Sequence, residues 1–437
     1  MVKAVTLVLV SFSLLMLPGV ANAAGAHATP VNSIRGVATG EAFASYVHAV
    51  RGSVTYTNGP VLLIAGNCLT ANFSHAASGA RVRLVPSALS TGGESQSVDD
   101  TVHAAYGTST ASVESISRIQ HVNLLGGMIK AGAMTAEANT SATAKSVSSN
   151  ANGTSIAGLV INGQKVSAKP NETVPLSGVG TVTIDQQSKP ATGSSSHIWV
   201  NLINVHFAKG NTLGVTPGSE LIVGHAYSSY ALTFSSDLVG AGSYGFNSYV
   251  QSGKDAAFSS GPQALAGIPC LGGSAENVVN KVQSPAGSTA TIDDTAKGRL
   301  TSSGAKAHAQ SKVASPLLPS VLSSMVSAGA LDVKVSASFK GVTPGHSFSF
   351  TAGSLKINGQ TVSSGRVPAN DSVVLKGVGY AILNERHVKT TKYSVQASIN
   401  GIDVHVTKKN AYGLPVGATI VFAHAQASAR RVFLTKP

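Results

Sequence analysis

The chain has little charge and very few acidic residues. Of its 437 residues, 18 are Asp or Glu and 31 are Lys or Arg, which is 11% in all and gives a net charge of +13. Disordered chains usually carry more charge and fewer aliphatic residues, whereas 43% of this chain is hydrophobic. A glycoside hydrolase needs a pair of carboxylates, so the shortage of acids argues against that class.

The basic residues are not clustered. They occur singly except for the doublets Lys408-Lys409 and Arg430-Arg431. Because nucleic-acid-binding proteins combine basic patches with stacking aromatic residues, we expect no nucleic-acid partner. The positive charge instead suits solubility and mild attraction to anionic cell-wall polymers or extracellular polysaccharide. Few carboxylates also suit an acidic medium, because few groups become protonated as the pH falls.

Catalytic motifs and good helix formers are both scarce. The sequence contains no Gly-x-Ser-x-Gly elbow, no His-Glu-x-x-His, no P-loop and no Gly-x-Gly-x-x-Gly that opens a helix. We therefore expect no catalytic residues and no cofactor. Glu, Lys, Leu and Met are few, whereas Ser, Thr, Val, Gly and Ala are abundant, and this bias favours strands and turns.

Long apolar runs are confined to the start of the chain. Lys3 precedes the apolar residues 4–17, and Ala21-Asn22-Ala23 forms a small-x-small cleavage site. This pattern predicts a secretory signal peptide over residues 1–23. No later run reaches the roughly 18 apolar residues of a membrane-spanning helix. We expect the mature chain to begin at Ala24 and to be extracellular or at the cell surface.

Several phrases occur twice in the same order. The paired segments are 45–47 and 248–250 (SYV), 67–69 and 269–271 around the cysteines, 98–101 and 292–295 (DDT), 126–134 and 323–331, 159–166 and 355–362 (INGQ), 177–180 and 376–379 (GVG), 203–206 and 402–405, and 219–226 and 418–425. The order predicts a tandem duplication. We expect a lead-in over 24–40, one domain over 41–235, and a second over 236–437 whose seam is GAGSYG (240–245).

The INGQ phrase predicts a tight hairpin in each copy. Asn162-Gly163 and Asn358-Gly359 lie between short apolar runs, and Asn-Gly favours the positive φ angles of a type I′ turn. Further strands follow the GVG bends, and 201–207 and 220–227 form another hairpin with a twin in copy two. The sequence therefore predicts an all-β protein, with two tandem antiparallel β-sandwich or barrel-like domains.

Four other segments are less regular. Residues 328–339 alternate apolar and polar side chains as a half-buried strand does, and 134–144 are the corresponding strand of copy one. Residues 188–197 and 254–263 are expected to be loops. In 114–127, apolar residues fall at every third position, which fits either a short helix or an irregular strand.

The order of these phrases resembles the choice-of-anchor P family of secreted actinobacterial proteins. The matching phrases are LLGG to AGA (124–133), the INGQ hairpin with its GVG bend, and the VH…PG…IVGHA ending, and the resemblance covers most of 41–227 and 243–427. It implies an extracellular or surface protein and supplies no catalytic residues. Members carry varied C-terminal anchors, and this chain shows no recognisable one.

The two cysteines, Cys68 and Cys270, are at equivalent points of the two copies. In an exported chain they are a candidate disulfide, which would link one copy covalently to the other. Two separate thiols, or pairing between molecules, are the alternatives.

Four recurrent histidines are the residues most suggestive of an enzyme. His206 and His225 in copy one correspond to His405 and His424 in copy two, on strands expected to pair. Two imidazoles on one face of a hairpin could begin a metal site, but no carboxylate recurs beside them as a third ligand. A packed, hydrogen-bonded histidine is the alternative.

Adjacent acids recur as Asp99-Asp100 and Asp293-Asp294. Calcium needs six or more oxygen ligands and other acids are few, so we expect an Asx turn or cap at these positions.

The sequence thus predicts a secreted or envelope-associated structural or adhesive protein without catalytic activity. The alternative is a secreted metal-dependent hydrolase that uses the recurrent histidines. Oligomeric state is left open.

Overall fold

The structure is a computed structural model of the chain. It describes residues 36–51, 54–85, 93–232, 237–252, 256–284, 287–318, 325–341, 343–362, 367–410, 414 and 416–431. The expected signal peptide (1–23) and most of the expected lead-in lie outside these residues. We refer to residues 36–232 as the first half and 237–431 as the second half.

The described residues are almost entirely β-strand, which confirms the all-β class. Strands of the first half are β1 (Gly36–Arg51), β2 (Val54–Val61), β3 (Ile64–Leu69), β4 (Phe73–Val85), β5 (Gly93–Tyr106), β6 (Thr110–Leu124), β7 (Ile129–Thr143), β8 (Val147–Asn150), β9 (Ser155–Ala157), β10 (Val160–Ile161), β11 (Gln164–Lys165), β12 (Glu172–Leu176), β13 (Gly180–Ser188), β14 (Ser195–Phe207) and β15 (Glu220–Leu232). A 3-10 turn, η2 (Leu125–Gly127), lies between β6 and β7.

The described residues of the second half form strands β16 to β32. They are β16 (Asp237–Ser252), β17 (Ala256–Gln263), β18 (Ala266–Gly267), β19 (Gly273–Val279), β20 (Val282–Ser284), β21 (Gly287–Thr289), β22 (Ile292–Thr301), β23 (Gly304–Ala314), β24 (Val326–Ser327), β25 (Ala330–Lys340), β26 (Thr343–Gly353), β27 (Lys356–Ile357), β28 (Gln360–Thr361), β29 (Asp371–Leu375), β30 (Gly379–Thr391), β31 (Ser394–Val406) and β32 (Thr419–Arg431). In the part of the chain that the structure describes, no helix is long and apolar enough to span a membrane.

The first half is a sandwich of two antiparallel sheets. One has the strand order β12-β13-β14-β15-β1-β2, and the other has the order β11-β10-β7-β6-β5-β4. The inward positions of both sheets form the core, as the period-two alternation of apolar residues requires. Core side chains from one sheet include Val98, Ile119 and Met134, and those from the other include Val182, Val200 and Val223.

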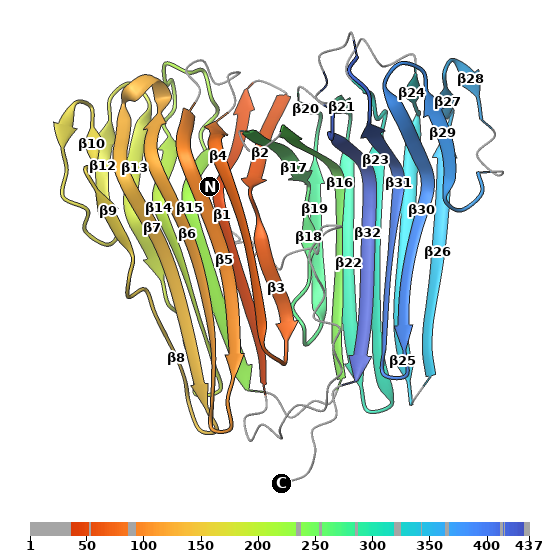
Figure 1. The fold of residues 1–437 in the computed structure, drawn as a ribbon, viewed down its shortest axis with the longest axis horizontal. Coiled ribbons are helices and arrows are strands. Elements are labelled where there is room, and N and C mark those ends of the chain that lie inside the picture. Colours follow the sequence, from red (N-terminus) through yellow and green to blue (C-terminus); the bar gives the residue numbers. More distant parts are fainter. Residues whose placement is uncertain are drawn as a thin grey trace, which may run out of the picture.

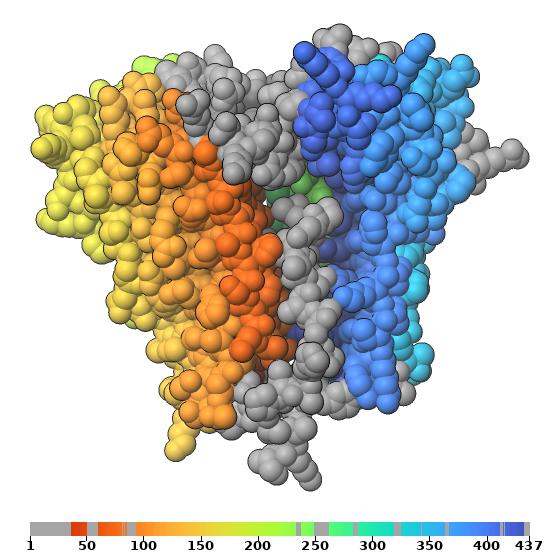
Figure 2. All heavy atoms as spheres, in the orientation of Figure 1, coloured from red at the N-terminus to blue at the C-terminus, as the bar shows by residue number. Residues whose placement is uncertain are grey.

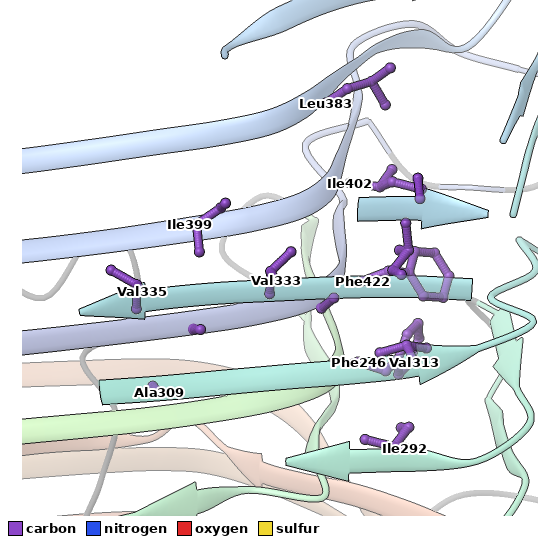
Figure 3. Packing of buried hydrophobic residues seen from close by; sticks show 14 of the residues in the cluster. Phe246, Ile292, Ala309, Val313, Val333, Val335, Leu383, Ile399, Ile402 and Phe422 are labelled. Carbon is purple, nitrogen blue, oxygen red and sulfur yellow. The ribbon is translucent and has the colours of Figure 1, made fainter. Parts of the chain in front are cut away.

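The second half repeats this order of strands. Its sheets are β29-β30-β31-β32-β16-β17 and β19-β22-β23-β25-β26. Figure 3 shows Ile399 on one layer facing Val333 and Val335 on the other, and these three residues belong with Leu383 to one buried cluster. Burial of each such side chain contributes about 1.5–3 kcal/mol to folding.

The two halves are joined along a shared sheet. Two parallel bridges join them: Gly59 to Ser260 connects β2 to β17, and Thr55 to Val282 connects β2 to β20. A cluster of apolar side chains also spans the junction, with Phe43, Leu63 and Ile222 from the first half and Tyr244, Leu265 and Val421 from the second. Figure 1 shows the halves side by side with β2, β3 and β17 between them, and Figure 2 shows their atoms on separate sides of the molecule.

The predicted hairpins are present. Ile161 pairs with Gln164 and Ile357 with Gln360, so both INGQ phrases form the expected turn. The long hairpin of 201–207 with 220–227 is β14 with β15. The strand over 328–339 is β25, with its buried residues at alternate positions, and 134–144 falls largely within β7.

Some predicted boundaries are wrong. The expected seam at 240–245 lies inside β16, and β1 begins at Gly36, within the expected lead-in. The segment 254–263 is not a loop, because β17 occupies 256–263. A long strand that carries few large apolar side chains and many Gly and Ser residues has the same composition as a loop, and only its pairing partners distinguish the two.

The ambiguous segment 114–127 is a strand, β6, followed by the turn η2. Its three-residue spacing has a local cause. Ile116 lies on the face opposite Ile119, and His121 has a positive φ of 53°, which shifts the alternation before Val122. A left-handed residue inside a strand thus gives its apolar positions the apparent period of a helix.

Candidate functional site

The two recurrent histidines of the first half lie on neighbouring strands but far apart. His225 on β15 is opposite Asn201 of β14, whereas His206 on β14 is opposite Glu220 of β15. The two imidazoles are therefore five positions apart along the strands, or about 17 Å at 3.4 Å per residue. The structure does not bring His206 and His225 together.

The second half repeats the arrangement. His424 on β32 is opposite Asn400 of β31, and His405 on β31 is opposite Thr419 of β32. His405 and His424 are likewise separated along the ladder. The equal spacing in the two halves reflects the same hairpin register, and it does not place two metal ligands side by side.

His225 is instead held by two neighbours. Its Nδ1 lies 2.6 Å from Oδ1 of Asn201, and its ring stacks on Phe43 with centroids 4.4 Å apart. An amide oxygen only accepts hydrogen bonds, so Nδ1 carries the proton of a neutral imidazole. Burial lowers the pKa of His225 to about 3, so the ring stays neutral at ordinary pH.

Three amides complete this site in the first half. The Nδ2 groups of Asn201 and Asn204 donate to Oε1 of Gln186, at 3.3 and 2.9 Å. Both asparagines are buried. We call this group the amide site; it consists of Phe43, Gln186, Asn201, Asn204 and His225.

The second half has the same site with two acids in it. Nδ1 of His424 is bonded to Oδ1 of Asn400, and the ring of His424 stacks on Tyr244 with centroids 4.6 Å apart. Nδ2 of Asn400 donates to Oε2 of Glu385 at 2.7 Å and to Oδ2 of Asp403 at 3.3 Å. We call Tyr244, Glu385, Asn400, Asp403 and His424 the carboxyl site.

The ladder registers place the two sites at equivalent positions. Gln186 is opposite Asn201 as Glu385 is opposite Asn400. Asp403 occupies the position of Asn204. The sites therefore differ in two amides exchanged for two carboxyls of nearly the same shape, and in the stacking ring, which is Phe43 in one and Tyr244 in the other.

The environment of the carboxyl site raises the pKa of Asp403. Burial raises the pKa of Asp403, and the nearby Glu385 raises it further, while a hydrogen bond from His405 opposes both effects. His405 Nε2 lies 3.4 Å from Oδ1 of Asp403, and this contact is the main cause of a raised pKa for His405. His387 Nε2 lies 3.0 Å from Oε1 of Glu385.

At the edge of each hairpin, the equivalent histidines thus differ in electrostatics. Burial alone lowers the pKa of His206, which has Asn204 in place of an acid. His405 has Asp403, and its pKa is raised. Tyr380 stacks on His405 with ring centroids 4.7 Å apart.

The recurrent acid pairs do not form turns, which corrects the expected Asx turn or cap. They lie within the strands β5 and β22, where alternation turns Asp100 and Asp294 into the sandwich and Asp99 and Asp293 outward. Burial raises the pKa of both inward carboxyls well above the ordinary value, and both are fully buried.

Cys68 and Cys270 are joined by a disulfide with a Cα–Cα distance of 5.5 Å. The bond lies at the junction, beside a small apolar cluster of Val37, Leu238 and Ala231. Arg430 of the second half donates a hydrogen bond to the Cys68 carbonyl. Because the bond closes a loop across 202 residues, the chain-entropy model gives it about 5 kcal/mol.

The hydrogen bonds within the amide site and the carboxyl site limit the chemistry that their side chains can perform. Within the described ranges, no three His, Cys, Asp or Glu side chains converge as a metal centre would require. Sequence reasoning identified the histidines but missed their partners Asn201, Asn400, Glu385 and Asp403. A signal was available for the asparagines, because Asn201 and Asn400 occupy matching positions once the strands of the two halves are aligned.

No family model matches the chain, and no curated protein is similar to it.

Proposed function

We propose that this is a secreted or cell-envelope-associated structural or adhesive protein without catalytic activity, built from two β-sandwich domains that arose by internal duplication. The resemblance of the INGQ, GVG and IVGHA phrases to the choice-of-anchor P family supports this proposal, and membership of that family is part of it.

One observation carries the proposal. In each half, a buried histidine that could have served catalysis, His225 or His424, is instead part of a hydrogen-bonded and stacked packing arrangement. His225 and His424 are each fixed by an asparagine and an aromatic ring, and burial keeps both imidazoles neutral. A general base needs an accessible imidazole that titrates near neutral pH, and these two histidines do not provide one.

The joining of the halves supports a mechanical role. A shared sheet, a mixed apolar cluster and the Cys68–Cys270 disulfide connect them into one body. Disulfides persist in oxidising compartments, which supports export. Two similar units at a fixed separation can engage a repetitive surface with higher avidity than one.

Binding to envelope material tests the adhesive role. The protein from residue 24 onward, with its disulfide intact, would be mixed with sedimentable cell-wall and polysaccharide preparations, and the bound fraction measured against an unrelated β-sandwich protein of similar charge. Saturable binding is expected, and retention equal to that of the control would refute adhesion.

The metal-dependent hydrolase is the competing proposal, and elemental analysis separates the two. The protein purified without chelator is expected to hold no stoichiometric zinc or copper. Stoichiometric metal that is lost in His225→Ala and His424→Ala would favour the metal-dependent hydrolase over the structural or adhesive protein.

A further inference from the structure

The second half carries an open groove on the outer face of the sheet β22-β23-β25. Its lining includes the β22–β23 hairpin and the end of β25, and its volume is about 540 Å³. These strands form the layer behind β30–β32 in Figure 1. The groove is separate from the amide site and the carboxyl site, which belong to the other sheet.

Four basic residues line this groove: Lys297, Arg299, Lys306 and Lys340, all of them exposed. Arg299 is directly opposite Lys306 in the ladder. Like charges directly opposite each other destabilise a sheet, so this arrangement costs folding free energy unless an anion binds.

Two lysines elsewhere on the same face form ion pairs with carboxylates. Farther from the hairpin, Lys312 pairs with Asp293 at 2.8 Å and Lys334 with Asp332 at 3.2 Å. Among the described residues, no carboxylate forms an ion pair with any of the four groove cations. The unbalanced charge is therefore concentrated at one end of the sheet.

The pKa of a histidine in the groove is affected by this positive charge. His308 is opposite Lys297 and half-buried. Burial lowers its pKa first, and Lys334, Lys297 and Lys306 lower it further, with a smaller opposing effect of Asp332.

The first half lacks the basic cluster. By ladder register, the positions of Lys297 and Arg299 are occupied there by His103 and Ala105, and those of Lys306 and Lys340 by Ser112 and Thr143. Glu114 replaces His308. The same backbone thus presents a basic surface in only one half, so the fold does not require the cations.

The geometry favours a linear anionic chain. Lys340, Lys306 and His308 are at successive levels two residues apart, or about 7 Å per level. Thr301, Ser303 and Ser338 add hydroxyl groups between the charges.

Aromatic stacking is not available at this surface. Phe339 is the aromatic residue of the lining, and its ring is buried beneath Arg431. Nucleic-acid grooves generally stack bases on exposed rings, so the lining favours a polymer without bases.

We propose that this groove binds a linear polyanion whose charges are phosphate diesters between polyol units. The proposal rests on the adhesive function above and names the class of polymer for it. The hydroxyl groups of the lining would contact the polyol. The four cations lie at three successive levels, with Arg299 and Lys306 at the same one, and would contact successive phosphates there.

The test compares two variants with equal changes in net charge. The groove variant is Lys297→Gln, Arg299→Gln, Lys306→Gln and Lys340→Gln. The control variant replaces four exposed lysines of the first half, Lys165→Gln, Lys169→Gln, Lys189→Gln and Lys209→Gln. Binding of a defined polyglycerol phosphate oligomer would be measured by titration calorimetry at two salt concentrations, and folding by thermal denaturation.

The wild-type protein is expected to bind with an affinity that falls as salt rises, since salt screens exposed charges. The groove variant is expected to bind at least about tenfold more weakly, because it lacks the four cations that attract the polyanion. The control variant is expected to bind within twofold of wild type. Should the groove variant fail to fold, the pair Arg299→Gln and Lys306→Gln provides the same comparison.

Four outcomes would overturn the proposal. The control variant could lose as much affinity as the groove variant, which would reduce the effect to net charge. Single-stranded DNA of equal charge, or a polyuronic acid, could bind more tightly than the phosphate polymer. The protein could bind envelope preparations but not the oligomer, in which case the adhesive function would survive and the groove would fail. If the protein bound neither the envelope preparations nor the oligomer, both the adhesive function and the groove proposal would be refuted.

Discussion

At the scale of single residues, the two halves form an internal comparison. Asn204 and Asp403 occupy the same position, and each lies near a histidine, His206 or His405. The pKa of His405 is raised, chiefly by its hydrogen bond with Asp403, whereas burial lowers that of His206. The carboxylate of Asp403 in place of the amide of Asn204 accounts for the opposite shifts in the two histidine pKa values, because only the carboxylate stabilises the imidazolium.

We therefore predict that Asp403→Asn lowers the pKa of His405 below its ordinary value of 6.5. Asn204→Asp should raise that of His206. NMR titration of the histidine Cε1 protons from pH 4 to 9 measures both. In the wild type, a group with a raised folded-state pKa stabilises the fold fully below pH 6.5 and loses this contribution as the pH rises through the folded-state value. Unchanged titration in both variants would contradict the assigned partners.

The buried acids give a second residue-scale prediction. Burial raises the pKa of Asp100, Asp294 and Glu41 in the folded state. Their contribution to stability is then fully present below about pH 4, the unfolded value, and is lost as the pH rises. The free energy of unfolding should fall between pH 4 and 8 on this account, in keeping with a chain suited to acidic surroundings.

Asp294→Asn should reduce this loss, by on the order of 1–3 kcal/mol at pH 8, because an amide does not ionise. Denaturant unfolding at pH 4, 6 and 8 measures it. Asp293→Asn is the matched control, since Asp293 is partly exposed in an ion pair with Lys312 and such pairs contribute about 0–1 kcal/mol. His225 and His424 act in the opposite sense, because their lowered pKa values remove stability as the pH falls from 6.5 toward 3.

At the scale of elements, the hairpins show how local chemistry sets structure. Asn358 and Gly359 have φ angles of 48° and 78°, and Asn162 and Gly163 have 51° and 80°. Nδ2 of Asn358 also donates to the Val374 carbonyl at 2.8 Å. The turn type follows from these two residues alone, which explains why it could be read from the sequence.

Gly359→Ala should lower the free energy of unfolding by about 1–2 kcal/mol, the cost of the left-handed conformation for a residue with a Cβ. The added Cβ would meet no atom within 4 Å, so the effect isolates backbone strain. Gly353→Ala is the control, because Gly353 does not have a left-handed φ and its Cβ would have ordinary contacts. Equal losses in both variants would show that strain is not the cause.

Long strands were harder to predict than turns. Repeated letters at 45–47 and 248–250 suggested equivalent residues, but the ladders match Val47 with Leu221 and Ser248 with Ile420. The equivalents of Ser45-Tyr46-Val47 are therefore residues 246–248, two positions away. Strand register depends on pairing partners distant in sequence, so a short local match can mislead.

At the scale of the whole molecule, the junction couples the two halves. The disulfide, the bridge from β2 to β17 and the mixed apolar cluster all cross between halves that each bury a core of their own. The halves should thus unfold in a coupled manner while the junction is intact.

Reduction, or Cys68→Ala with Cys270→Ala, is predicted to lower the free energy of unfolding by up to about 5 kcal/mol through the entropy of the unfolded chain. Denaturant unfolding with and without reductant measures this loss. The double variant is its own control, because reductant should leave its stability unchanged. A wild-type protein insensitive to reductant, with the bond shown to be broken, would contradict the prediction.

The sequence alone determined the strand-rich class, the hairpin turns and the matching order of the two halves, because composition, Asn-Gly turns and alternation act over a few residues. Only the tertiary structure decided that Cys68 meets Cys270, that His225 and His424 are paired with asparagines and not with His206 and His405, and that Glu385 and Asp403 share a site. These contacts depend on strand register and on the packing of one half against the other. Such long-range geometry is fixed by the whole set of pairings at once, and no single stretch of the chain encodes it.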